Sequence, residues 1–294
     1  MKREIINDLV KWKNRSDRKP LILLGARQVG KTFILKEFGR RYYKNTAYIN
    51  CDSNALVKDL FKADYDIDRI LLAIGSITGE SIIPGETLII LDEIQELHRG
   101  LNALKYFCEN APQYHVAVAG SLLGITLHQG ESYPVGKVNT IEMHPMTFSE
   151  FLLAKGRDKM VDLLRQKQWD VIASLSSLYT QILREYYFVG GMPEAVKTFI
   201  ATNDAVKVRE VQKEILLAYD KDISKHAPAN EAVRINQVWK SIPAQLAKEN
   251  RKFIYGVVRS GARAKDYEVA LQWLLDAGLV HMVERVRTPA MPLK

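Results

Sequence analysis

The chain of 294 residues carries a formal net charge of +8, and 47% of its residues are hydrophobic. This length exceeds that of one ordinary domain, so we expect two or three compact units. Its two cysteines exclude a metal cluster or a disulfide framework and indicate a reducing compartment. No apolar run reaches the roughly 18 residues of a membrane helix and the N-terminus lacks a signal-peptide core, so we expect a cytoplasmic protein.

A strand, a glycine-rich loop and a helix are predicted in succession near the N-terminus. Residues 21–24 are all apolar, as in a strand that is covered on both faces of a parallel sheet. The next segment, GARQVGKT, fits the phosphate-loop pattern G-x4-G-K-[ST], and the apolar residues after it recur at helical spacing. Because the pattern alone arises by chance in roughly one chain per hundred of this length, a plain strand-to-helix turn is the alternative.

Each residue type in this loop suits the phosphates of a nucleotide. Gly25 and Gly30 permit a tight turn with positive φ, in which successive backbone N–H groups point at a phosphate. Lys31 supplies a positive charge to the β- and γ-phosphates, and Thr32 offers a hydroxyl to Mg²⁺. The predicted nucleotide-binding residues are Gly25, Ala26, Arg27, Gln28, Val29, Gly30, Lys31, Thr32 and Phe33.

Two further strands are predicted to end in polar residues at the same edge of the sheet. Residues 87–91 form a buried strand that ends in Asp92 and Glu93. We predict that Asp92 holds Mg²⁺ and that Glu93 deprotonates the attacking water, the alternative being a solvated acidic strand end. The strand at 116–119 ends in Gly120 and Ser121, which makes Ser121 a candidate sensor of the γ-phosphate or part of an ordinary turn.

The rest of the chain is predicted to form a helical lid at 153–224 and a winged-helix-like module at 225–294. In the module, one amphipathic stretch, broken or kinked near Pro243, and a second stretch are followed by a strand at 279–286. Residues 151–294 carry an excess of seven positive charges against one in residues 1–150. This excess is consistent with duplex DNA as a partner, with protein docking, or with scattered solvated lysines. The candidate phosphate contacts are Arg259, Arg263, Lys265, Arg285 and Arg287.

These motifs together carry a family resemblance. The chain contains, in order, GARQVGKT, LIILDEIQE, VAVAGS, KVNTIEMHPMTFSEFL and GGMPEAV. From about Pro20 to the last residue it resembles a prokaryotic AAA-type P-loop ATPase family with a C-terminal domain of unknown function. The resemblance implies ATP rather than GTP, a five-stranded core sheet in residues 1–152, and nucleotide roles for Lys31, Thr32, Asp92, Glu93 and Ser121.

The chain departs from the family pattern in two ways. Gly136 and Lys137 stand where such proteins often carry Gly-Arg, which puts a trans-acting arginine in doubt. The candidates for a cation supplied by a neighbouring subunit of a homo-oligomer are Arg99, Lys137 and Arg157. The family also commonly continues into a nuclease-like module, so a fragment of a longer protein and a short variant are both open.

From the motifs and the resemblance we predict an α/β P-loop ATPase that couples hydrolysis of Mg-ATP to a conformational switch of its lid. A static helical cap is the alternative for the lid. For the whole chain, the alternatives are a slow, nucleotide-dependent module that docks DNA or a protein partner, and a kinase with its own acceptor site. The histidines form no ligand set, so no metal other than Mg²⁺ is expected.

Overall fold

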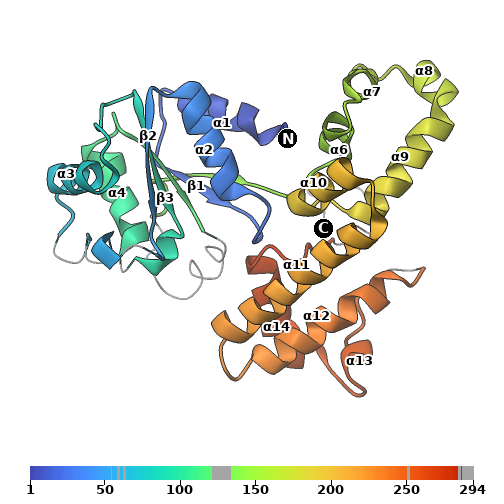
Figure 1. Ribbon diagram of the computed structural model, residues 1–294. Coiled ribbons are helices and arrows are strands. Elements are labelled where there is room, and N and C mark those ends of the chain that lie inside the picture. Colours follow the sequence, from blue (N-terminus) through green and yellow to red (C-terminus); the bar gives the residue numbers. More distant parts are fainter. Residues whose placement is uncertain are drawn as a thin grey trace. The chain divides into compact units, whose positions relative to one another are not determined.

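The structure is a computed structural model that describes residues 1–53, 55–57, 60–61, 64–97, 99–120, 134–249, 252–283 and 286. The chain divides into two compact units, Met1–Tyr219 and Asp220–Lys294. The first unit contains a sheet with flanking helices and a group of further helices, and the second unit is helical (Figure 1). The three-part division drawn from the sequence remains a prediction.

A five-stranded parallel sheet lies in the first unit, as the family resemblance implies. The strand order is β2-β3-β4-β1-β5, and every pair of neighbouring strands runs parallel. Two neighbouring strands, β3 and β4, are buried along their full length. The strands are β1 (Leu21–Leu24), β2 (Asn45–Asn50), β3 (Thr87–Asp92), β4 (His115–Ala119) and β5 (Asn139–Glu142).

Helices cover both faces of this sheet. In Figure 1, α1 and α2 lie on one face, and α3 and α4 lie on the other. Apolar side chains of α3, α4 and the central strands form a core cluster of this unit. The helices are α1 (Ile5–Lys13), α2 (Lys31–Tyr42), α3 (Ile67–Thr78) and α4 (Gly100–Asn110), with single turns η1 (Ala55–Val57) and η2 (Ile94–Glu96).

A second group of helices follows β5 and forms its own apolar cluster. Its first helix begins with a capping box, in which Thr147 accepts from the N–H of Glu150 while Glu150 accepts from the N–H of Thr147. The helices are α6 (Phe148–Ala154), α7 (Asp158–Arg165), α8 (Trp169–Ser174), α9 (Ser176–Val189), α10 (Pro193–Thr202) and α11 (Ala205–His226).

The second unit bears on two predictions from the sequence. Its helices are α12 (Ala232–Leu246), α13 (Tyr255–Val258) and α14 (Ala264–Asp276). Helix α12 continues through Pro243 to Leu246, so of the two expected alternatives, a break or a kink, the break does not occur.

The predicted strand at 279–286 is absent from its described residues, 279–283 and 286. A strand needs a partner for its backbone hydrogen bonds, and the described part of this unit contains no other strand. The wing of the winged helix is therefore not seen there. Arg285 and Arg287 lie outside the described residues. Among the described helices of the whole chain, none combines the length and the apolar character needed to cross a membrane.

Candidate functional site

The phosphate loop connects β1 to α2 in the conformation that its glycines predict. Gly25 has φ 143° and Gly30 has φ 98°, and Gly30 is the residue that precedes the first turn of α2. A Cβ atom on Gly25 would lie 2.2 Å from the carbonyl oxygen of Met143, so only glycine fits there. Ala26 and Val29 of the loop are buried. Phe33, at the end of the predicted set, is 57% exposed.

Lys31 lies against the loop that precedes it. Its ammonium donates to the carbonyl oxygens of Gly25 at 2.7 Å and Ala26 at 2.9 Å. Burial lowers the pKa of Lys31 to about 8, while the carboxylates of Glu93 and Asp92 act in the opposite direction. The positive charge is therefore poorly solvated, and an anionic phosphate would compensate for the lost water.

Thr32 and Asp92 meet as the sequence predicts for a magnesium site. The hydroxyl of Thr32 donates to Asp92 Oδ2 at 2.6 Å, and the hydroxyl of Tyr48 donates to the same oxygen at 3.2 Å. These hard oxygen donors fit Mg²⁺, which commonly takes one or two protein ligands together with water and substrate phosphates. No cluster of three or more His, Cys, Asp or Glu suited to a metal occurs among the described residues.

Tyr48 is a site residue that the motifs did not identify. It lies on β2, and the β2–β3 register places Asn50 opposite Asp92. The Lys36 ammonium lies 3.4 Å from the centre of its ring. Burial, followed by the nearby Asp92 carboxylate, raises the pKa of Tyr48 to about 12, so its hydroxyl remains a donor at neutral pH.

Glu93 occupies a strained backbone position at the end of β3. Its φ of 54° lies in the left-handed region, which non-glycine residues rarely adopt. The side-chain amide of Gln95 donates to Glu93 Oε2 at 2.6 Å, whereas the buried Oε1 of Gln95 has no hydrogen-bond partner. Gln95 thus restrains the carboxylate of Glu93, which the sequence predicts to be the base. The motif spacing alone did not indicate this role for Gln95.

The other predicted site residues are the sensor of the γ-phosphate and the candidate trans-acting cations. Ser121 lies outside the described residues, so its predicted sensor role stays a prediction. Arg99 stacks on the ring of Tyr65, with its guanidinium carbon 4.5 Å from the ring centre. Lys137 pairs with Glu109 at 2.9 Å. Arg157 is the residue that precedes α7.

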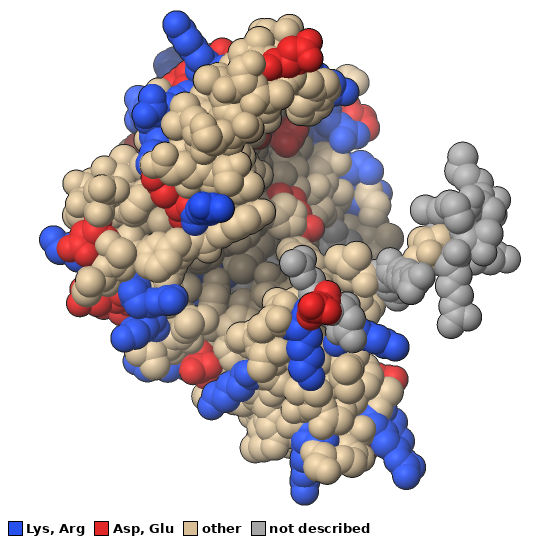
Figure 2. All heavy atoms as spheres, turned by 90° about the vertical axis from the view of Figure 1, so that its right-hand side faces the viewer, with Lys and Arg blue, Asp and Glu red and all other residues tan. Residues whose placement is uncertain are grey.

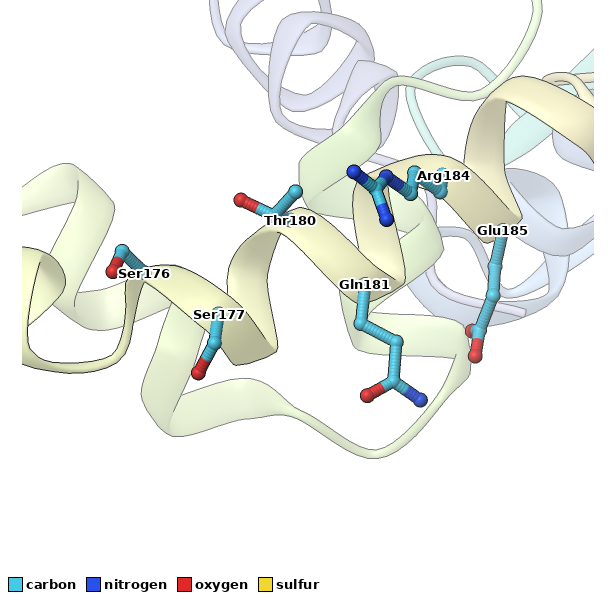
Figure 3. Close-up of a pocket in the computed structure, with 6 residues that line it drawn as sticks. All are labelled: Ser176, Ser177, Thr180, Gln181, Arg184 and Glu185. Carbon is cyan, nitrogen blue, oxygen red and sulfur yellow. The ribbon is translucent and has the colours of Figure 1, made fainter.

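A separate hollow along α9 contains no comparable set of groups. Figure 3 shows its six labelled side chains projecting from a single helix. One of them, Glu185, already pairs with Lys155. The lining residues are Ser176, Ser177, Thr180, Gln181, Arg184 and Glu185. We therefore place the candidate site at the phosphate loop.

Fold and site together define the class of the protein. A parallel sheet carries a phosphate loop after β1 and paired carboxylates after β3, which is the arrangement of a P-loop nucleotide-binding fold. Residues 17–152 match the family model described as an AAA domain. Residues 180–294 match a model described as a domain of unknown function (DUF8612). The chain thus carries an AAA domain of the P-loop ATPase type, followed by a domain of unknown function.

One solved structure supports this fold, and two others are reported beside it as similar chains. The Walker-type ATPase PABY2304 of Pyrococcus abyssi is 17% identical with a TM-score of 0.59, over 94% of this chain and 89% of that one. The Aeropyrum pernix ORC1 protein in complex with DNA is 14% identical with a TM-score of 0.36, over 93% and 81%. The replication initiator DnaA bound to AMPPCP and single-stranded DNA is 15% identical with a TM-score of 0.40, over 92% and 85%. A search of curated proteins found no match.

Proposed function

We propose that the protein binds Mg-ATP at the phosphate loop and hydrolyses it to ADP and phosphate. The observation that carries the proposal is the hydrogen bond of 2.6 Å between Thr32 and Asp92. It joins the end of the phosphate loop to the end of β3, beside the buried ammonium of Lys31. A positive charge, a hydroxyl and two carboxylates thus lie together at one edge of the sheet, as phosphoryl transfer to water requires.

Each group has a distinct part in this reaction. Lys31 and the loop N–H groups bind the β- and γ-phosphates, and Glu93 accepts a proton from the attacking water. The water oxygen bonds to the γ-phosphorus as the bond to the bridging oxygen breaks, and ADP leaves. Thr32 and Asp92 would hold Mg²⁺, which would neutralise the negative charge of the phosphates.

Separate substitutions distinguish binding from chemistry. Lys31→Ala should weaken ATP binding, because Lys31 contacts phosphate in the ground state and in the transition state. Glu93→Gln should retain binding and lose turnover, because Glu93 acts on water. Equilibrium binding of ATP and release of inorganic phosphate measure the two effects. Equal turnover in Glu93→Gln and the parent would refute the assignment of the base.

The products distinguish this function from its alternatives. ADP with free phosphate supports hydrolysis, whereas ADP with a phosphorylated acceptor indicates a kinase. Tight binding of ATP with negligible turnover indicates a nucleotide-dependent docking module. Incubating the protein with γ-labelled ATP, with and without Mg²⁺, and separating the labelled products makes this decision directly.

We further propose that the nucleotide state alters the helices from α6 to α11, so that a conformational switch is the output. Support comes from the hydrogen bond that the Tyr219 hydroxyl on α11 donates to the Arg27 carbonyl of the phosphate loop, at 2.8 Å. A loop that rearranges around phosphate would act directly on this helix. Lid movement can be measured by amide hydrogen exchange with and without nucleotide.

Duplex DNA is the second candidate ligand, on the C-terminal unit. Arg259, Arg263 and Lys265 are all exposed close to the start of α14, where the helix dipole adds positive potential. Figure 2 shows Lys and Arg side chains scattered over the visible face, with Asp and Glu among them. The proposal therefore concerns this short segment rather than a continuous basic surface.

A further inference from the structure

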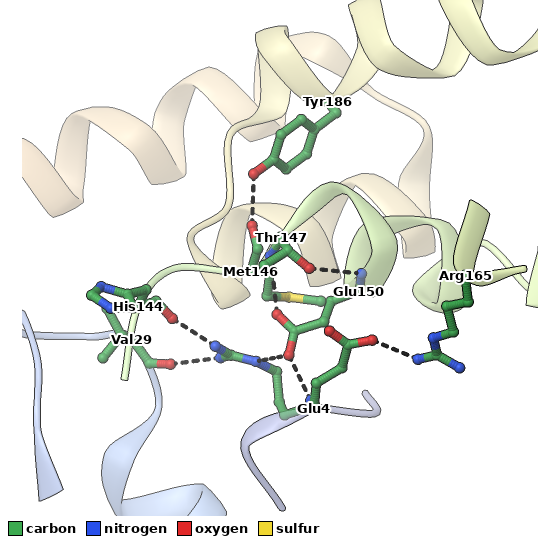
Figure 4. Close-up of polar contacts among 9 residues, drawn as sticks. Glu4, Val29, His144, Met146, Thr147, Glu150, Arg165 and Tyr186 are labelled. Carbon is green, nitrogen blue, oxygen red and sulfur yellow. Dashed lines mark hydrogen bonds and ion pairs between the residues drawn. The ribbon is translucent and has the colours of Figure 1, made fainter. Parts of the chain in front are cut away.

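A buried arginine near the N-terminus contacts the backbone of the phosphate loop. The guanidinium of Arg3 donates to the carbonyl oxygen of Val29 at 2.9 Å and to that of His144 at 2.6 Å. Its Nε donates to Glu150 Oε1 at 3.1 Å. Figure 4 shows Val29, His144 and Glu150 converging on this point from three segments of the chain. The guanidinium thus joins the phosphate loop, the segment after β5 and helix α6.

Both charged partners are removed from water. The side chain of Arg3 is 7% exposed and that of Glu150 is 4% exposed. Glu150 also accepts from the N–H of Glu4 at 2.7 Å and from the N–H of Thr147 at 3.0 Å. A buried ion pair is held firmly only when its polar atoms are bonded, and here each guanidinium nitrogen and both carboxylate oxygens have a partner. Glu150 is therefore a fixed anchor for Arg3.

The contact with Val29 bears on how the loop meets phosphate. A trans peptide unit is planar, so the carbonyl of Val29 and the N–H of Gly30 point in opposite directions. Because the carbonyl oxygen of Val29 accepts from Arg3, the N–H of Gly30 points away from Arg3. In the proposed complex, backbone N–H groups of this loop face the phosphates.

We propose that Arg3 is a positioning residue for the phosphate loop: anchored by Glu150, it fixes the Val29–Gly30 peptide plane in the orientation that binds nucleotide phosphate. The inference rests on the proposed nucleotide site, and it assigns a binding role to a residue outside every motif of the sequence. Arg3 acts through the loop backbone and does not itself contact the nucleotide.

The test compares Arg3→Met with a matched control at the neighbouring position. Methionine keeps much of the length of the stem and removes all donors. Lys2→Met is the control, because Lys2 forms an exposed ion pair with Asp158 at 3.0 Å that makes no loop contact. Affinity for Mg-ADP is measured by titration calorimetry well below the melting temperature of each variant, and the melting temperature without nucleotide is measured separately.

We expect Arg3→Met to weaken Mg-ADP binding about tenfold, and Lys2→Met to stay within twofold of the parent. A merely structural role for Arg3 would lower the melting temperature and leave the affinity of the folded protein within threefold of the parent, which would overturn the proposal. If Arg3→Met does not fold, Arg3→Lys is judged by the same threefold limit. Lysine keeps the charge beside Glu150 but lacks the planar fork that reaches several acceptors.

The anchoring role of Glu150 is tested by a double-mutant cycle with Glu150→Gln. If Glu150 acts through Arg3, the double variant should bind Mg-ADP no more weakly than Arg3→Met alone. Fully additive losses would overturn the anchoring role. A parent protein that binds ADP but releases no phosphate from ATP would refute the proposed hydrolysis alone. A parent that binds no nucleotide would refute both proposals.

Discussion

The hydroxyl of Tyr219 donates to the carbonyl oxygen of Arg27 at 2.8 Å, across 192 positions of the sequence. Tyr219 lies on α11 and is 8% exposed, and Arg27 lies in the middle of the phosphate loop. The loop backbone is therefore fixed from outside by two side chains, Tyr219 at Arg27 and Arg3 at Val29. A conformational change of the loop on phosphate binding would alter both of these hydrogen bonds.

Tyr219→Phe should weaken the response of α11 to nucleotide. The substitution removes one hydroxyl and keeps the ring, so the expected loss of stability is only about 1 kcal/mol. In the parent, a non-hydrolysable ATP analogue should slow or speed amide exchange in residues 205–219. In Tyr219→Phe, the exchange of this segment should be nearly the same with and without the analogue.

Tyr187→Phe is the matched control, because Tyr187 lies on α9 in the same unit and is 74% exposed. It should respond to the analogue like the parent. A full response of α11 in Tyr219→Phe would mean that the hydroxyl contributes to stability alone and not to the switch.

Gln95→Ala should lower kcat about tenfold and leave KM nearly unchanged. The amide of Gln95 holds Glu93 at 2.6 Å, so its loss frees the proposed base to rotate without touching the phosphate contacts. Steady-state phosphate release over a range of ATP concentrations separates the two constants. A rise of KM at constant kcat would place Gln95 in ground-state binding instead.

Gln95→Glu tests the same contact through pH. Two carboxyl groups at this distance cannot both ionise freely, so the pKa of the pair should rise. Because the proposed base must be ionised, the acid limb of the kcat profile should move to higher pH in Gln95→Glu. An unshifted profile would contradict direct contact between residues 93 and 95 in the working enzyme.

The motif residues could be predicted because their chemistry is tied to local order in the chain. A buried strand, a glycine turn and a helix define where Lys31 and Thr32 must lie. The carboxylate of Asp92 follows the same rule at the end of β3. Parallel strands bring such ends to one edge of the sheet, so the Thr32–Asp92 contact follows from pattern and topology together.

The supporting contacts could not be predicted, because they depend on tertiary packing. Arg3 and Tyr219 reach the loop from segments with no motif of their own, and each uses a backbone carbonyl that any residue type provides. The contact of Tyr48 with Asp92 depends on the strand order, which places β2 beside β3. The strand expected at 279–286 is absent from its described part because a run of apolar residues does not itself supply a partner strand.

His115 should make the protein less stable in mild acid. Burial lowers the pKa of His115 from 6.5 to about 4, and the positive charges of Arg18 and Lys13 act in the same direction. The hydroxyl of Tyr43 lies 2.7 Å from its Nδ1. Between these two pKa values the unfolded chain binds a proton that the folded chain does not, so stability falls as pH falls through this window.

The loss attributable to this group is about 3 kcal/mol at most. Urea unfolding of the parent and of His115→Gln, at several pH values from neutral down to 4, measures it. Glutamine can accept from Tyr43 and does not titrate, so the variant should lose less stability over the window. Parallel curves for the two proteins would assign the acid sensitivity to other groups.

Replacing Arg259, Arg263 and Lys265 together by Ala should reduce the salt dependence of duplex DNA binding. Each phosphate contact contributes about 0.9 to the slope of log K against log salt, so three lost contacts should lower the slope by between about 2 and 3. Fluorescence anisotropy of a labelled duplex at several salt concentrations measures the slope. Ala at the exposed residues Lys159, Lys207 and Lys213 is the charge-matched control in the first unit. If the parent does not bind duplex at low salt, DNA is excluded and protein docking by this unit is favoured.

Lys137→Ala should leave the rate of ATP hydrolysis unchanged. The Lys137 ammonium pairs with Glu109 of its own chain at 2.9 Å, and this hydrogen bond raises the pKa of Lys137. An ammonium also cannot make the planar, two-pronged contact by which a guanidinium stabilises the charge of a phosphoryl group. We therefore expect a specific activity that does not depend on protein concentration, and that stays within twofold of the parent in Lys137→Ala.

Phosphate release at protein concentrations spanning two orders of magnitude tests this. Activity that rises with concentration in the parent but not in Lys137→Ala, at equal ATP affinity, would instead identify Lys137 as a cation supplied to a neighbouring subunit. Glu109→Gln, which releases Lys137 from its partner, should then increase the rate.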